Sequence, residues 1–170
     1  MQDNDGNAGD NAGVQFFTPP NTVREKVTGS GGPTKEMLAK ADAAISKMTE
    51  DYPKWAIQDV DRLRELVDSE ANDGKRDETR LQEAYKLSHD MRGQGGSFGY
   101  PMITGVAGSF CSFVNSLDTL DDKAVAILQA HVKAMRAVLL NKISGDGGPI
   151  GAKILDGLQK AVSKYDRKDD

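Results

Sequence analysis

The chain has 170 residues, of which 38% are hydrophobic, 28% charged and only 6% aromatic. That length suits one domain, and a chain of this size can bury roughly 70% of its unfolded surface without disulfides or metals. With 22 basic and 26 acidic residues, the formal net charge is −4, which argues against a general nucleic-acid binder. The single cysteine and two histidines exclude an internal disulfide and leave too few ligands for a Cys-based zinc cluster or a multi-histidine metal site.

No apolar run approaches the roughly 20 residues that a helix needs to cross a bilayer. The first residues, Met1 to Gly6, lack the basic and apolar regions of a signal peptide. We therefore expect a cytoplasmic protein, with neither membrane nor nucleic acid among its partners.

Residues 1–33 differ from the rest in composition. They are rich in Asn, Asp and Gly, and their only apolar cluster is Val14, Phe16 and Phe17. Such a segment cannot bury enough apolar area to offset the entropy lost on ordering. We expect a disordered tail at 1–33, followed by a single helical domain at 34–170.

From Thr34 onward, apolar residues recur at the spacing of amphipathic helices, and no alternating strand pattern occurs. The first helix is predicted from its N-cap Thr34 to about Glu50, and Pro53 is predicted to begin a second helix. The apolar stripe of that second helix contains Trp55, Ala56, Val60, Leu63, Leu66 and Val67. A third helix is predicted from about Asp77 to the glycines at 93–96, where the pattern leaves its end open.

Three further helices are predicted. Pro101 fits the first turn of the fourth, whose apolar stripe is opposite a face of small residues: Gly105, Gly108, Ser109, Ser112 and Ser116. The fifth follows Asp118, with Thr119 and Asp122 spaced as a capping box, and the sixth extends from about Pro149 to Tyr165, with Ile150, Ile154, Leu155 and Leu158 in its stripe. Short connections make consecutive helices antiparallel neighbours. We expect an all-α fold: an antiparallel four-helix bundle, centred on about 53–142, with an additional helix at each end.

The two histidines differ in their helical surroundings. His131 falls inside the apolar stripe of the fifth helix, which favours a core or boundary histidine with one hydrogen bond. His89 lies about 100° from the apolar centre of its helix, on the polar side. Four and seven residues further on, the same face has Gly93 and Gly96 instead of larger side chains. The imidazole of His89 is therefore predicted to be accessible to a large partner.

The glycines at 93, 95 and 96 also have a structural explanation. A glycine inside a helix costs about 1 kcal/mol relative to alanine, so three of them require close helix packing, a helix end or a surface cleared for a partner. A neutral imidazole is a good nucleophile near pH 7, and the guanidinium of Arg92, three residues after His89, suits a phosphoryl group. Since the sequence has no phosphate-binding loop for a nucleotide, it predicts a phosphoryl acceptor without an ATP site of its own.

Residues 88–99 are Ser-His-Asp-Met-Arg-Gly-Gln-Gly-Gly-Ser-Phe-Gly and resemble the signature of histidine-containing phosphotransfer (HPt) domains of bacterial multistep phosphorelays. That signature has a histidine, a basic residue at +3, glycine at +4, a small residue at +7, an apolar residue at +9 and glycine at +10. Six positions agree: His89, Arg92, Gly93, Gly96, Phe98 and Gly99. The basic residue is arginine instead of the commoner lysine, and Gly95 is an additional glycine.

The resemblance implies that His89 accepts a phosphoryl group, through Nε2, from the receiver-domain aspartate of a hybrid histidine kinase and passes it to the receiver of a response regulator. Arg92 would stabilise the phosphoryl charge, and Gly93 and Gly96 would clear the surface for the receiver, which supplies Mg²⁺. The chain would then be a phosphoryl carrier and not an enzyme, with no cofactor of its own. The exposed site favours a monomer.

The docking surface is predicted around His89, with Lys86, Gly105, Gly108 and Ser112 as candidate receiver contacts. The alternative for the small residues is close packing of a terminal helix. Two other functions remain open. One is a helical adaptor that is never phosphorylated, and the other is a metal-dependent phosphohydrolase built on His89 and Asp90, for which too few histidines remain to complete a metal shell.

Overall fold

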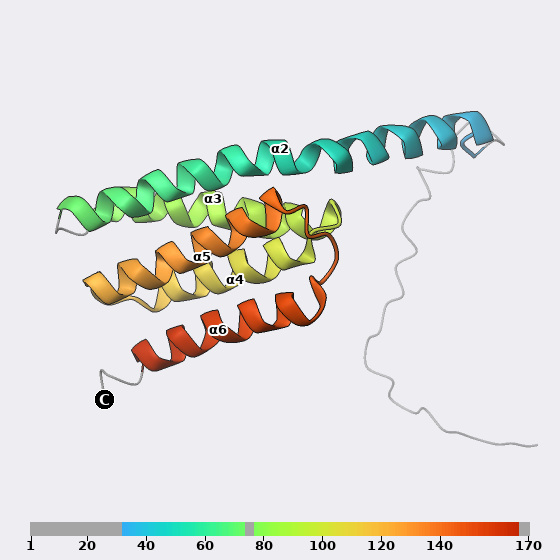
Figure 1. The fold of residues 1–170 in the computed structure, drawn as a ribbon. Helices are drawn as coiled ribbons and strands as arrows, with labels where there is room; N and C mark the ends of the chain where they lie inside the picture. The colour runs from blue at the N-terminus through green and yellow to red at the C-terminus, as the bar shows by residue number, and fades with distance from the viewer. Residues whose placement is uncertain (1–31, 74–76, 167–170) are drawn as a thin grey trace, which may run out of the picture. The chain divides into compact units, whose positions relative to one another are not determined.

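The computed structural model describes residues 32–73 and 77–166, where all regular secondary structure is helical. The helices in this range are α2 (Lys35–Asp73), α3 (Glu78–Ser97), α4 (Pro101–Ser116), α5 (Asp122–Leu140) and α6 (Gly148–Asp166) (Figure 1). The predicted all-α fold is confirmed, while most of the predicted tail, at 1–31, lies outside the described residues. None of the described helices is both long and apolar enough to cross a membrane. The chain divides into two compact units, 1–38 and 39–170.

Side-chain caps mark where α2 and α5 begin. Thr34 caps α2 as predicted, because its hydroxyl accepts the backbone N–H of Met37 at 3.2 Å. The cap of α5 is Asp121, whose carboxylate accepts the N–H of Ala124 at 2.7 Å. The predicted cap at Thr119 is therefore wrong. The carboxylate next to the helix satisfies the free N–H groups of the first turn instead.

The predicted helix break at Pro53 is also wrong, because α2 continues through this residue. An internal proline removes the N–H that would bond the carbonyl of Thr49, and it costs about 3 kcal/mol. The flanking residues Tyr52 and Ala56 are both 1% exposed, and the Tyr52 ring stacks on Phe98 with ring centroids 4.9 Å apart. These buried contacts offset the cost of the proline and keep both segments in one helix.

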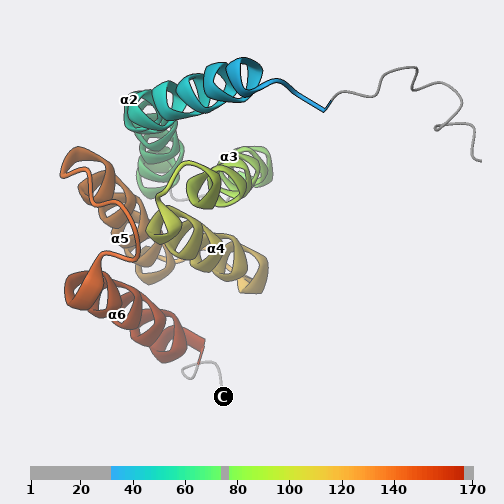
Figure 2. The ribbon, with the colours of Figure 1, turned by 90° about the vertical axis from the view of Figure 1, so that its right-hand side faces the viewer.

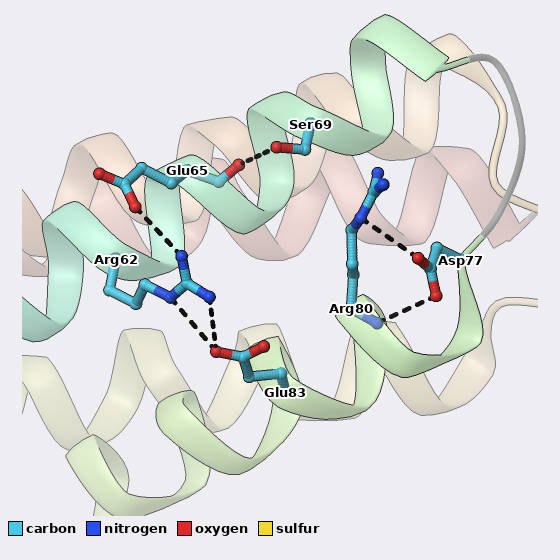
Figure 3. A network of polar contacts seen from close by, with 6 residues as sticks. All are labelled: Arg62, Glu65, Ser69, Asp77, Arg80 and Glu83. Carbon is cyan, nitrogen blue, oxygen red and sulfur yellow. Dashed lines mark hydrogen bonds and ion pairs between the residues drawn. The ribbon is translucent and has the colours of Figure 1, made fainter.

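In the unit 39–170, hydrogen bonds connect α2, α3, α4 and α5 in a closed ring. In order, they are Arg62 to Glu83 at 2.9 Å (Figure 3), Ser88 to the carbonyl of Ala107 at 3.2 Å, Ser109 to His131 at 2.9 Å, and Gln129 to Asp68 at 2.8 Å. Consecutive helices run in opposite directions (Figure 1). Figure 2 shows α6 outside this ring, where it packs against α4 and α5.

The core of this unit consists mainly of the predicted apolar stripes. Side chains that are fully buried include Val60, Leu63, Ile103, Val106, Phe110, Phe113, Leu128, Met135 and Val138. Burying one such side chain contributes roughly 1.5–3 kcal/mol, whereas the ion pair between Arg62 and Glu83 is exposed and screened by solvent, so it contributes little. Apolar packing therefore holds the helices together, and the polar contacts in Figure 3 add little.

Two predicted members of the stripes are exposed. Trp55 is 47% exposed and Ile150 is 66% exposed. Each is adjacent in sequence to a residue that takes the buried position of its turn, Ala56 in α2 and Gly151 in α6. Because neighbouring helical residues are about 100° apart, the larger side chain lies at the edge of the stripe and faces solvent.

His131 is a buried core residue, as predicted, but it has two hydrogen bonds instead of one. Nδ1 lies 2.8 Å from the carbonyl oxygen of Ile127, which can only accept, so Nδ1 carries the proton. Nε2 then accepts from the Ser109 hydroxyl at 2.9 Å. The ring packs against Phe110 and Phe113, with centroids 6.1 and 6.4 Å away. Burial lowers the pKa of His131 below its usual value.

We expect the protein to lose stability as the pH falls below about 6.5, the pKa of an unfolded histidine. Burial holds the folded pKa of His131 lower, so between the two values only the unfolded chain binds the extra proton. The stability that neutral His131 contributes is complete above about pH 6.5, and it is lost as the pH falls through the pKa of His131 in the folded protein. Urea unfolding of the wild type and His131→Gln between pH 8 and 5 measures it. An identical pH dependence of both proteins, which share His89, would exclude His131 as the cause.

Candidate functional site

Helix α3 positions His89 on the surface. The helix begins near Asp77, as predicted: Asp77 is its N-cap, and its carboxylate accepts the N–H of Thr79 at 2.9 Å. The chain remains helical through Gly93–Gly96. The buried Ser88 donates its hydroxyl proton to the carbonyl of α4 that lies 3.2 Å away. This contact fixes the rotation of α3, so that the next residue, His89, points away from the core and is exposed.

One side of the His89 imidazole is supported by an aromatic ring. The Tyr85 ring, one helical turn earlier, lies 6.0 Å from the imidazole between centroids, with 26° between the planes. These two residues, together with Lys86 and Asp90, line a shallow surface depression of about 320 Å³. Tyr85 therefore limits the motion of the imidazole toward the beginning of α3, and the glycines follow on its other side.

The three glycines of α3 have different surroundings. A Cβ atom added at Gly93 would have no heavy atom within 4 Å, and one at Gly96 would meet the Thr104 hydroxyl at 3.5 Å, an ordinary contact. A Cβ at Gly95 would lie 2.9 Å from the backbone N of Thr104 and the backbone O of Tyr100. Both explanations for the glycines therefore apply. Gly95 allows close packing of α3 on α4, while Gly93 and Gly96 leave a bare surface beside His89.

Arg92 extends back along α3 toward the level of His89. Its backbone carbonyl accepts from the Thr104 hydroxyl at 3.0 Å, whereas its side chain lies over Gly108, one turn further along α4. A Cβ at Gly108 would be 3.4 Å from Cδ of Arg92 and 3.9 Å from Cγ. Ser88 contacts α4 at the residue before Gly108. Because the two helices are antiparallel, the aliphatic part of the Arg92 side chain is level with Ser88, the residue next to His89.

Thr104 was not predicted as part of the site. Its hydroxyl accepts the N–H of Gly96 at 2.8 Å and donates to the carbonyl of Arg92 at 3.0 Å. These two backbone groups are the ones that bond each other in a regular α-helix. The α4 hydroxyl therefore bridges the backbone of α3 directly below the bare surface. No local sequence pattern distinguishes Thr104 from any other polar helix residue.

The predicted docking residues lie in different places. Lys86, beside His89, and Ser112 on α4 are exposed. A Cβ at Gly105 would lie 3.3 Å from Cδ2 of Leu155 in α6. Gly105 thus fits the alternative explanation, close packing of a terminal helix, whereas Gly108 faces the side chain of Arg92.

The charge around His89 is unequal on its two sides. On the α2 side, burial raises the pKa of the Asp59 carboxyl, and the nearby charge of Asp90 raises it further. On the α4 side lies the guanidinium of Arg92. A negatively charged group that approaches His89 therefore meets Arg92 on the α4 side, whereas Asp90 on the other side is accompanied by Lys86 in the same depression. In the described part of the chain, no three His, Cys, Asp or Glu side chains are placed to hold a metal ion.

Comparison with known proteins gives no relative from which a function could be transferred. No protein-family model matches the chain, and no curated protein or solved structure matches it either. Any function assigned to it therefore depends on its own residues, their geometry, and the resemblance of residues 88–99 to the HPt signature.

Proposed function

We propose that this chain is a phosphoryl carrier of the HPt type. It accepts a phosphoryl group on His89 from the receiver-domain aspartate of a hybrid histidine kinase and passes it to the receiver of a response regulator. The observation that carries this proposal is the exposed imidazole of His89 beside the bare surface at Gly93 and Gly96. The other histidine, His131, is 0% exposed and hydrogen-bonded at both ring nitrogens, so it is not open to a receiver.

The transfer needs few groups from this chain. The lone pair on Nε2 of neutral His89 attacks the phosphorus of the receiver's aspartyl phosphate. The N–P bond forms as the P–O bond breaks, and the aspartate carboxylate leaves with the bonding electron pair. Nδ1 keeps its proton, so the attack requires no general base. The guanidinium of Arg92 stabilises the charge on the phosphoryl oxygens, and the receiver brings Mg²⁺.

The helix arrangement suits such a carrier. The ring of hydrogen bonds among α2, α3, α4 and α5 supports an antiparallel four-helix bundle, with α6 as an additional helix. In this arrangement His89 lies midway along one helix, where a receiver has access to it. We further propose that the carrier is a cytoplasmic monomer, since its kinase and regulator partners would meet the same exposed surface in turn.

Phosphotransfer profiling tests the proposal. When the chain is incubated with radiolabelled, phosphorylated receiver domains from the same cell, the wild type should gain an acid-labile, alkali-stable phosphoryl group, and His89→Gln should gain none. Circular dichroism checks that both proteins are folded, and Gln94→Ala, at an exposed residue of the same helix, is the matched control. If no receiver phosphorylates the wild type, the proposal is wrong and the helical adaptor is favoured. If His89→Gln is labelled equally, the proposal is wrong because another residue accepts the phosphoryl group.

A further inference from the structure

We infer that Thr104 and Gly108 of α4 are positioning residues, which hold Arg92 where it can meet a phosphoryl group on His89. This inference rests on the function proposed above. Two observations carry it: the Thr104 hydroxyl donates to the backbone carbonyl of Arg92 at 3.0 Å, and a Cβ atom added at Gly108 would meet Cδ and Cγ of Arg92 at 3.4 and 3.9 Å. Thr104 fixes the backbone of Arg92, and Gly108 allows the direction that its side chain takes.

The need for positioning follows from the chemistry of arginine. Arg92 is exposed, and a long exposed side chain occupies many rotamers unless its aliphatic part is supported. A guanidinium stabilises a phosphoryl group best when it is already oriented before the partner arrives. The missing side chain at Gly108 leaves a groove between α4 and the methylene groups of Arg92, where an added Cβ would already touch these groups at 3.4 and 3.9 Å. A branched residue there would fill this groove and push the arginine away from the surface.

Close helix packing does not explain Gly108 in the way that it explains the other small residues. The atoms within 4 Å of a Cβ at Gly108 both belong to the side chain of Arg92, whereas a Cβ at Gly95 would meet backbone atoms of α4 and one at Gly105 would meet a side chain of α6. The space at Gly108 therefore faces the side chain of one residue, Arg92, and no backbone atom of α3.

The Thr104 hydroxyl acts on the backbone. It lies between the N–H of Gly96 and the carbonyl of Arg92, so it sets the position of the α3 turn from which the arginine extends. Thr104→Val keeps the shape of the side chain and removes the hydroxyl, whereas Thr104→Ser keeps the hydroxyl. We expect Thr104→Val to slow phosphoryl transfer and Thr104→Ser to restore most of the rate.

A double-mutant cycle tests the role of Gly108. Gly108→Leu is made in the wild type and in Arg92→Ala, and the rate of transfer from a phosphorylated receiver is measured separately from receiver affinity. We expect Gly108→Leu to lower the transfer rate about tenfold to hundredfold in the wild type and to have no further effect in Arg92→Ala. Gly157→Leu, at an exposed glycine of α6 with open space around it, is the control for leucine in a helix.

Each other outcome overturns the inference. An equal loss in both backgrounds would mean that the leucine blocks the receiver directly, and no loss in the wild type would mean that Arg92 needs no support. The Nε–H signal of Arg92 in a ¹H–¹⁵N spectrum gives a second test that does not depend on transfer. This signal should report a side chain that is restricted in motion in the wild type and freely mobile in Gly108→Leu. Equal mobility of the Arg92 side chain in both proteins overturns the inference. A wild type that no receiver phosphorylates would refute the proposed function alone.

Discussion

Replacing Gly95 with valine should lower the free energy of unfolding by about 3 kcal/mol, the upper part of the range for an overpacked core. The added Cβ would lie 2.9 Å from two backbone atoms, the N of Thr104 and the O of Tyr100. These atoms cannot rotate away as a side chain does. The N–H of Tyr100 also donates to the carbonyl of Gly95 at 2.7 Å, so α3 and α4 are joined at this point. The substitution must therefore push the two helices apart or distort the turn between them.

Gly93→Val is the matched control for this prediction, because it introduces the same side chain into the same helix two residues earlier. A Cβ at Gly93 meets no heavy atom within 4 Å, and valine has a slightly better helix propensity than glycine. We expect its stability to equal or slightly exceed that of the wild type. Urea unfolding followed by circular dichroism measures all three proteins. Equal stabilities of Gly95→Val and Gly93→Val would show that α4 can move aside without loss of stability and that Gly95 is not a packing residue.

Replacing Gly93 with leucine should slow phosphoryl transfer to His89 about hundredfold while the protein remains folded. Gly93 lies one turn after His89 on the same face of α3, and the space beside it is open. A leucine would stand next to the imidazole and keep the phosphorus of the receiver from reaching Nε2. A misplacement of about 1 Å is sufficient to cost roughly 10²-fold in rate.

The measurement is the rate at which the acid-labile phosphoryl group appears on the chain at a fixed concentration of phosphorylated receiver. Gly157→Leu serves again as the control, since it places the same side chain at an exposed position of α6. Gly93→Leu at the full wild-type rate would remove the steric argument for the glycines, without deciding whether His89 is the acceptor. A protein that unfolds would instead contradict the open surroundings of Gly93.

Much of the fold follows from the sequence because burial is periodic. The residues of the α4 and α5 stripes are buried as their spacing predicts, since only one face of each helix can meet the others. The helix break at Pro53 was predicted from a local rule, and the buried contact of Tyr52 with Phe98 overrides that rule. Local signals fix where a helix prefers to begin, but contacts between distant residues decide whether it does.

Some features of the candidate site can also be predicted from the sequence, and others cannot. The exposure of His89 and the bare surface at Gly93 depend on helical rotation within α3 alone, so the sequence predicts them. The contact of Gly108 with Arg92 depends on how far α4 is shifted along α3. The nearness of Asp59 to Asp90 depends on the packing of α2 on α3. No pattern within a single helix encodes either relation, and both required the three-dimensional structure.

Within a little more than one turn, α4 contacts three different parts of the molecule. Gly105 meets Leu155 of α6, Gly108 meets Arg92, and Ser109 bonds His131 of α5. A shift of this short stretch of α4 would change all three contacts together. The packing of α6 and the placing of the Arg92 side chain therefore depend on the same few residues of α4.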